Sequence, residues 1–190
     1  LIGSTQVQGR CSVGGNLCNS SPAADTIPAL MANGAQCVIN GQGGERTVAV
    51  EDFVTGVTQN CMEKGELLSL IRIPRPAAKT SDAYLRFIPR TEMDIAVAAV
   101  ASSVSLENGK ISSCRIALAA VGPTPIYAEE ASKLLIGKEP SEENIKNASN
   151  KAKEIASPIS DMRGTIEHRK DLIEVLTRRT LSKAVERVSV

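Results

Sequence analysis

The spacing of apolar and polar positions in the first third of the chain indicates a helix followed by strands. The apolar run at 27–32 predicts a short helix packed on a sheet. Short segments rich in apolar residues, separated by Gly-rich turns, then predict strands. Glu51 and Asp52 are suited to the first turn of a helical segment between the last two strands. The predicted strands span 36–40, 45–50 and 66–73.

The middle of the chain has the pattern of an antiparallel sheet. Residues 75–82, which follow Pro74, have the composition of a linker. Three strand candidates come after it, and Asn108-Gly109 between the last two is a strong signal for a tight hairpin turn. We therefore predict a three-stranded antiparallel meander with strands at 84–88, 94–106 and 111–121.

The last third of the chain changes to a helical pattern. Gly122 and the two prolines after it end the sheet, and Gly137 is a good residue to end the first helix. Ser141 can cap the second helix, because two glutamates follow it in the first turn. The third helix has apolar side chains along one face. The predicted helices span 127–136, 141–156 and 165–188.

Composition and charge narrow the class of protein. The chain has 190 residues, of which 42% are apolar and 23% charged, enough for one domain or two small ones. A net charge of +1 provides no general attraction for nucleic acid or membrane surfaces, and two Phe, two Tyr and no Trp make a base-stacking platform unexpected. No apolar run approaches about 18 residues, so we expect no membrane-spanning helix.

Cysteine usage indicates the compartment. The five cysteines are odd in number and form no Cys-x-x-Cys pair, and only one histidine is present, so a Cys/His metal site is not expected. The chain also shows no basic and apolar leader of the secretory type. We therefore expect reduced thiols and a cytoplasmic protein.

Small polar residues and glycines are concentrated at 12–26. In one interpretation, Gly14 and Gly15 expose amides to a phosphate or a ring edge, Asn16 adds a donor, and Asp25 accepts from ribose or ribityl hydroxyls. In the other, this is a Gly-rich turn in which Ser and Asn cap the next helix. Sequence spacing alone leaves both open.

Two further polar clusters can be interpreted either as solvated surface or as functional contacts. Residues 86–94 either face a ligand or a partner, with Arg86 or Arg90 in contact with an anion, or form a solvated loop with local Arg–Glu and Arg–Asp ion pairs. The basic residues of the last helix and the turn before it either are solvated or dock a partner, and His168 among them is expected at the surface. No nucleophile with a base can be assembled, so a cofactor must supply any chemistry. These basic residues are Arg163, Arg169, Lys170, Arg178 and Arg179.

A set of short motifs spread over nearly the whole chain provides the functional indication. Together they resemble the FAD-binding (medium) subunit of molybdenum hydroxylases, the group that includes carbon monoxide dehydrogenase and bacterial xanthine dehydrogenase. Each motif alone is weak, whereas the combination is specific. The motifs lie at 12–17, 21–25, 28–30, 65–68, 73–74, 87–96, 116–118, 122–125, 135–138 and 156–164.

The resemblance implies an α+β fold in two parts. Residues 1–77 resemble the second half of a two-part FAD-binding domain, a mixed sheet with helices. Residues 82–190 resemble the C-terminal domain of the same subunit, a three-stranded antiparallel sheet packed with a bundle of three helices. The family's first glycine-rich FAD loop has no counterpart in the sequence, and Gln8 and Cys11 differ from the residues usual before the second loop.

The resemblance also implies the cofactor and its contacts. FAD is expected, with its diphosphate and flavin edge along Ser12, Val13, Gly14, Gly15 and Asn16. By the same motif match, Asp25 would hold ribityl or ribose hydroxyls and Leu68 would touch the ring system. Arg86 falls where relatives place a basic residue near the flavin.

Partners follow from the same resemblance. A large subunit with the molybdenum cofactor would oxidise the substrate, and a small iron–sulfur subunit would relay electrons to FAD and from there to an acceptor. The chain would then be one subunit of an FAD-dependent oxidoreductase and inactive alone, with a homo-oligomer as a further expectation. The alternative is an interaction module without flavin that docks to a partner or to itself.

Overall fold

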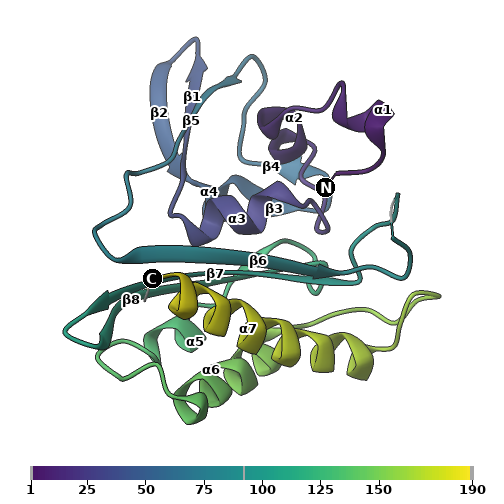
Figure 1. The fold of residues 1–190 in the computed structure, drawn as a ribbon. Coiled ribbons are helices and arrows are strands. Elements are labelled where there is room, and N and C mark those ends of the chain that lie inside the picture. Colours follow the sequence, from purple (N-terminus) through teal and green to yellow (C-terminus); the bar gives the residue numbers. More distant parts are fainter. Residues whose placement is uncertain (1, 92, 189–190) are drawn as a thin grey trace.

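The chain folds into a sheet covered on both faces, with a second, smaller sheet above it (Figure 1). The structure, a computed structural model, describes residues 2–91 and 93–188. Glu92, which belongs to the polar cluster at 86–94, therefore lies outside the described residues. The fold class is α+β, as predicted. No helix in the described part of the chain is long and apolar enough to cross a membrane.

The first part of the chain builds the smaller sheet, in which β1 pairs antiparallel with both of its neighbours. The predicted helix and three strands in this part are confirmed, whereas α1 and the ribbon of β3 and β4 had no sequence signal. The elements are α1 (Thr5–Gln8), α2 (Val13–Cys18), α3 (Thr26–Ala32), β1 (Gln36–Gly41), β2 (Gly44–Ala49), α4 (Val50–Phe53), β3 (Val54–Gly56), β4 (Gln59–Asn60) and β5 (Leu67–Arg72).

The second part builds the larger sheet, with strand order β6-β7-β8-β9 and antiparallel pairing throughout. Asn108 and Gly109 both have positive φ, 50° and 78°, which confirms the predicted hairpin turn. The elements are β6 (Thr80–Phe87), β7 (Ala98–Glu107), β8 (Lys110–Ala119), β9 (Ile126–Tyr127), α5 (Glu129–Lys133), α6 (Glu142–Ile155) and α7 (Ile166–Val188).

Several boundaries differ from the prediction, among them the start of β7, which lies at Ala98 and not at residue 94. β6 begins at Thr80, so the predicted linker at 75–82 overlaps the strand. The predicted meander gains a short fourth strand, because residues 126–127 pair with β8 beyond the Gly-Pro turn. Tyr127 therefore belongs to a strand, and the helix predicted at 127–136 is confined to α5.

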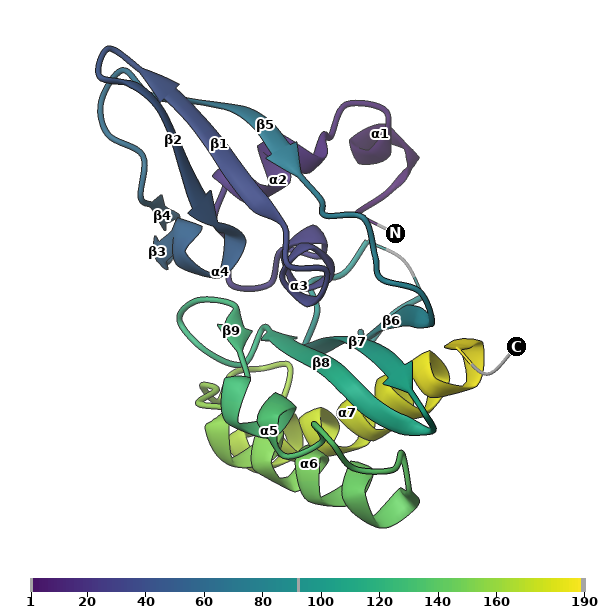
Figure 2. The same ribbon diagram turned by 90° about the vertical axis from the view of Figure 1, so that its left-hand side faces the viewer.

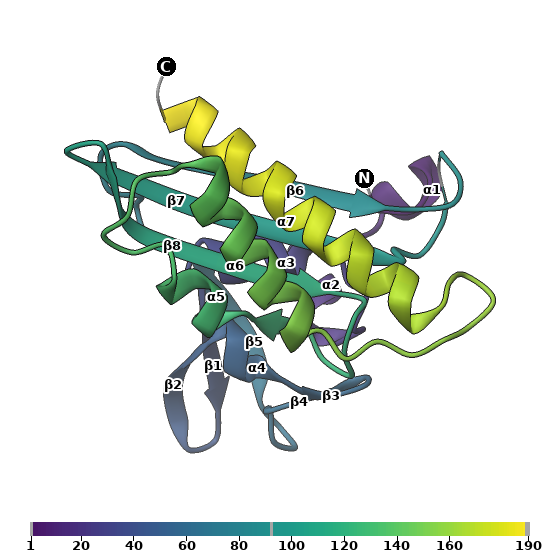
Figure 3. The ribbon, with the colours of Figure 1, turned by 90° about the horizontal axis from the view of Figure 1, so that it is seen from below.

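The two faces of the larger sheet carry side chains of different size. The helices α5, α6 and α7 cover one face of this sheet (Figures 2 and 3). Large residues such as Val100, Ile116 and Leu118 face the core shared with the helices. Alanines alternate with them, and Ala99, Ala117 and Ala119 belong to other clusters on the opposite side. Because small side chains allow close approach, α3 can lie directly over β7 and β8.

Arg115 on β8 joins the larger sheet to α3 and α4. Its Nε donates to the carbonyl oxygen of Met31 at the end of α3, at 2.8 Å, and its Nη2 donates to Glu51 Oε1 on α4, also at 2.8 Å. The guanidinium also lies 4.2 Å from the centre of the Tyr127 ring. A cation at the C-terminal end of α3 is favoured by the helix dipole, so this residue fixes where α3 sits on the sheet.

Candidate functional site

The segment 12–16 is the start of a helix rather than an open glycine loop. Ser12 is the N-cap of α2, and its Oγ accepts from the Gly15 amide at 3.0 Å. A Cβ on Gly15 would lie 3.0 Å from this oxygen, so glycine leaves room for the cap. The prediction of a loop is wrong here, because the serine cap lets the glycines join a helix. The amides of Val13 and Gly14 lie at the helix start, where no acceptor within the helix exists.

Leu68 on β5 lies beside this helix start. A Cβ on Gly14 would meet Leu68 Cδ2 at 3.8 Å, an ordinary van der Waals distance. Leu68 is half-buried and packs against the core of the smaller sheet, whereas Val13 is 49% exposed. The structure therefore brings Leu68 together with the predicted segment 12–16.

Asn16 caps the helix that follows. Its Oδ1 accepts from the Thr26 amide at 3.2 Å and from the Thr26 hydroxyl at 2.5 Å. This replaces a cap from Asp25, which stands at the N-cap position of α3 without a side-chain bond to the helix. The interpretation in which Ser and Asn cap helices is confirmed by these contacts, and ligand binding by the same residues stays a prediction.

The side chain of Asp25 does not cap α3 and bonds to residues of β6. Its Oδ1 accepts from the Tyr84 hydroxyl at 2.8 Å, and its Oδ2 accepts from Arg86 Nη1 at 2.6 Å. The side chains of Asp25 and Arg86 are only 17% and 9% exposed. Burial raises the pKa of Tyr84, and the Asp25 carboxylate raises it further. Two predicted site residues, one from each part of the chain, thus form a single half-buried cluster.

Two cavities meet at Asp25. One, of about 440 Å³, is lined by eight polar or charged residues together with apolar ones and is called the polar cavity, and the other, of about 530 Å³, is mainly apolar. Both are within the range of small-molecule sites. Asn16 lines the first and Val13 the second, whereas Ser12, Gly14, Gly15, Leu68 and Arg86 line neither. The polar residues of the first cavity are Ser4, Asn16, Asn19, Ser21, Asp25, Arg90, Asp94 and Arg163.

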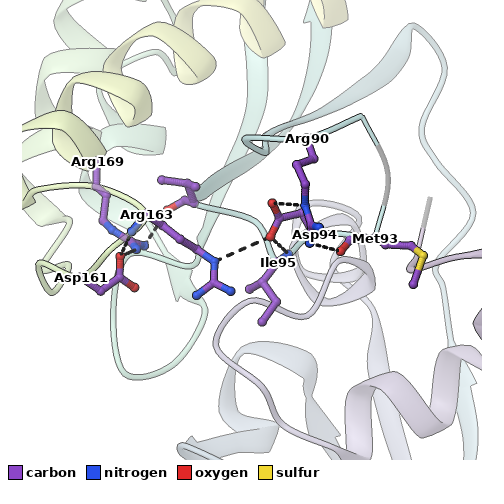
Figure 4. A network of polar contacts seen from close by, with 8 residues as sticks. Arg90, Met93, Asp94, Ile95, Asp161, Arg163 and Arg169 are labelled. Atoms are coloured by element: carbon purple, nitrogen blue, oxygen red, sulfur yellow. Dashed lines mark hydrogen bonds and ion pairs between the residues drawn. The ribbon is translucent and has the colours of Figure 1, made fainter.

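The rim of the polar cavity contains an ion-pair network that joins two distant loops (Figure 4). Arg90 Nε lies 3.3 Å from Asp94 Oδ2, and Arg163 Nε lies 3.7 Å from Asp94 Oδ1. Burial raises the pKa of Asp94, but the Ile95 amide and the two arginines outweigh it and lower the pKa overall. The local Arg–Asp pair predicted for 86–94 is therefore confirmed for Arg90, and Arg86 pairs with the distant Asp25.

Arg169 is the residue that sequence reasoning placed wrongly. It was predicted among the basic side chains of the last helix that are solvated or dock a partner, but it is only 4% exposed. Its Nη2 donates to Asp161 at 2.7 Å, and its Nη1 donates to backbone oxygens of Val97 and Ala120. The motif at 156–164, which includes Asp161, was the available signal. His168 beside it is exposed, as predicted, and its ring centre lies 5.8 Å from that of Phe87.

Potential metal ligands do not cluster in the described part of the chain. No group of three or more His, Cys, Asp or Glu within residues 2–91 and 93–188 is arranged to hold a metal ion. The five cysteines are all unpaired, and burial is the main cause that raises the pKa of Cys37 and of Cys114 to about 12. Both thiols are therefore core side chains in character.

Comparison with known families assigns both parts of the chain. Residues 1–76 match the family described as the FAD binding domain in molybdopterin dehydrogenase. Residues 83–184 match the family described as the CO dehydrogenase flavoprotein C-terminal domain.

Curated relatives and solved structures agree with these matches. The carbon monoxide dehydrogenase medium chain of Afipia carboxidovorans is 37% identical over 98% of the chain, which spans 65% of that relative. Caffeine dehydrogenase subunit beta from a Pseudomonas species is 33% identical over 96% of the chain and 62% of the relative. The carbon monoxide dehydrogenase structure from Hydrogenophaga pseudoflava superimposes with a TM-score of 0.94 at 33% identity, covering 98% of this chain and 65% of that one.

Proposed function

The chain belongs to the family of FAD-binding medium subunits of molybdenum hydroxylases, and from this premise we propose that it holds part of an FAD site in such an oxidoreductase. The observation that carries the proposal is the position of Asp25. Its carboxylate is oriented by Tyr84 and Arg86 and lines both a polar and an apolar cavity. A dinucleotide with a flavin ring presents polar and apolar parts in the same molecule, which matches such a pair of cavities.

The donor and acceptor groups around the cavities fit FAD. Oδ1 of Asp25 accepts from Tyr84 and Oδ2 accepts from Arg86, and each oxygen retains a lone pair for a ribityl or ribose hydroxyl. Arg90 and Arg163 line the polar cavity and both pair with Asp94 through Nε, so their other N–H groups are the donors that a diphosphate would meet. The second cavity offers apolar side chains to a ring system, among them Val13, Leu30 and Ile73.

Each residue of the proposed site has its own task. Asp25 binds hydroxyls, and Tyr84 and Arg86 fix the direction of its carboxylate. The first amides of α2, at Val13 and Gly14, are available to an anion, because glycine allows close approach of the backbone. Leu68 supports this helix start from β5. When bound, FAD supplies the electron-transfer chemistry.

The rest of the enzyme is proposed from the relatives. The chain spans 62–65% of the length of the relatives named above, of which one is a medium chain and one a subunit beta. We propose that it works with a large subunit that carries the molybdenum cofactor and a small iron–sulfur subunit, and that electrons reach FAD from the iron–sulfur clusters. A homo-oligomer of this assembly is part of the same proposal.

Titration with FAD and with its two halves tests the proposed site. We expect FAD to bind with a perturbed visible flavin spectrum and more tightly than FMN or ADP, because binding energy from both halves combines within one ligand. Gly15→Val should weaken FAD, since a Cβ at this position displaces the Ser12 cap. A protein that takes up no FAD contradicts the proposal and favours an interaction module without flavin.

A further inference from the structure

Arg169 joins three loops that surround the proposed FAD site. We propose that it is a positioning residue, which sets the wall of the polar cavity through the backbone of these loops and does not itself line that cavity. This inference rests on the proposed function for its effect on FAD. Its structural part, the anchoring of the loops, can be tested without FAD.

The guanidinium of Arg169 is buried and divided among three segments. It donates to Val97 O at 2.9 Å, to Ala120 O at 3.1 Å and to Asp161 Oδ1 at 2.7 Å. A buried cation costs free energy unless it is well paired, and an apolar side chain often stabilises such a site equally well. The observed arrangement therefore indicates a demand for fixed geometry rather than for stability alone.

Ala120 transmits this anchor to the segment that ends at Asp25. Its φ of 63° lies in the left-handed region, which a residue with a Cβ adopts only when its surroundings hold it there. Arg169 holds its carbonyl oxygen, and its own amide donates to Pro22 O at 2.8 Å. The backbone of Ala120 is therefore hydrogen-bonded both to Arg169 on α7 and to Pro22 in the segment 21–25.

Val97 and Asp161 transmit the anchor to the ion-pair network at the rim. The Val97 amide donates to Phe87 O at 2.9 Å and closes the loop that contains Arg90 and Asp94. Asp161 forms an isolated β-bridge with Gly164, and the turn between them carries Arg163 toward Asp94 (Figure 4). Arg169 therefore bonds both to the loop that carries Arg90 and Asp94, through Val97 O, and to the turn that carries Arg163, through Asp161.

The residues that line the polar cavity are those that can contact a ligand there directly. Asp94, Arg163 and Asp25 line the polar cavity, whereas Arg169 is absent from its lining and lines the neighbouring cavity of about 410 Å³. If Arg169 acts through Val97, Ala120 and Asp161, its removal makes the loops that contain these residues more mobile and lowers the affinity for FAD. The rest of the larger sheet keeps its structure.

Arg169→Met tests this, because it removes the charge and its hydrogen bonds while keeping a long side chain. Arg178→Met is the matched control, since Arg178 lies exposed on the same helix. Hydrogen exchange is measured at the amides of Val97 and Ala120, and FAD affinity is measured at a temperature where both variants are fully folded. We expect exchange at these two amides and the FAD Kd each to rise by roughly tenfold in Arg169→Met, and neither to change in the control.

Arg169→Lys provides a second variant if the first fails to fold. Lysine retains the charge but has no planar fork, so it should reach only some of the three acceptors and recover part of the FAD affinity. Wild-type exchange at Val97 and Ala120 in the folded variant overturns the inference, as does unchanged FAD affinity when wild type binds FAD. A wild type that binds no FAD contradicts the proposed function instead, and faster exchange at Ala120 then still supports the anchoring.

Discussion

Arg86 Nη1 lies 2.6 Å from Asp25 Oδ2 and joins residues 61 positions apart in the chain. The pair links the start of α3 to β6, so it connects the smaller sheet's unit with the larger sheet. Tyr84, two residues before Arg86 on β6, donates to the other oxygen of the same carboxylate. One acidic side chain therefore both joins the two parts of the fold and faces the two cavities.

Loss of Arg86 should weaken folding and FAD binding together. In Arg86→Met, the half-buried Asp25 carboxylate loses a charged donor, and we expect the free energy of unfolding to fall by about 2 kcal/mol. The FAD Kd should rise as well, because the carboxylate loses its fixed direction. Denaturant unfolding and FAD titration measure the two effects. Arg75→Met, at an exposed position, should change neither, and equal stability of Arg86→Met and wild type would refute the role of the pair.

Gly14→Ala should weaken FAD binding without lowering the stability of the folded protein. A Cβ here meets only Leu68 Cδ2, at 3.8 Å, and alanine favours a helix over glycine by up to about 1 kcal/mol. We therefore expect unchanged or slightly higher stability, with weaker FAD binding because the backbone can no longer be approached closely. Gly43→Ala, which adds a Cβ in open space, is the control. FAD affinity that survives Gly14→Ala would remove the start of α2 from the site.

Tyr84 should ionise only at strongly alkaline pH. Burial and the Asp25 carboxylate raise the pKa of its hydroxyl above the ordinary value of 10.0. The stability contributed by the neutral hydroxyl is then fully present below about pH 10 and lost as pH rises through the folded-state pKa. Tyrosinate absorbance of wild type minus that of Tyr84→Phe isolates this residue. A transition near pH 10 in the folded protein would count against the hydrogen bond to Asp25.

Glu66 on the smaller sheet should make stability sensitive to acid. Hydrogen bonds from Arg46, and one from the Glu63 amide, lower the pKa of Glu66 from 4.5 to about 2. The stability from this pair is therefore present above about pH 4.5 and lost as pH falls toward 2. Glu66→Gln should lose less stability than wild type across this window, whereas exposed Glu45→Gln should follow wild type. Parallel curves for wild type and Glu66→Gln would contradict this account.

Sequence alone predicted the parts of the fold that depend on local pattern. The hairpin at Asn108 and Gly109 follows from turn chemistry, and α7 follows from one apolar face. The ribbon of β3 and β4 and the short β9 were not foreseen, because strands of two or three residues have too little pattern. The helix at 13–18 was missed, because paired glycines favour a loop unless the Ser12 cap is taken into account.

The candidate site was only partly predictable, because its contacts join distant positions. The resemblance pointed to Asp25 and Arg86 separately, whereas their ion pair emerges only when β6 crosses beneath α3. The burial of Arg169 was not predictable from an amphipathic helix, since two of its three acceptors are backbone oxygens of loops 49 and 72 residues away. Long-range backbone acceptors leave no periodic signal in a sequence.

A structure of the protein with bound FAD would show whether Asp25 belongs to the FAD site. We expect an oxygen of Asp25 within hydrogen-bond distance of a ribityl or ribose hydroxyl, with Tyr84 and Arg86 still holding the carboxylate. We also expect the flavin ring against the apolar cavity next to Val13 and Ile73. FAD bound elsewhere on the chain, with Asp25 in contact only with Tyr84 and Arg86, would contradict this expectation.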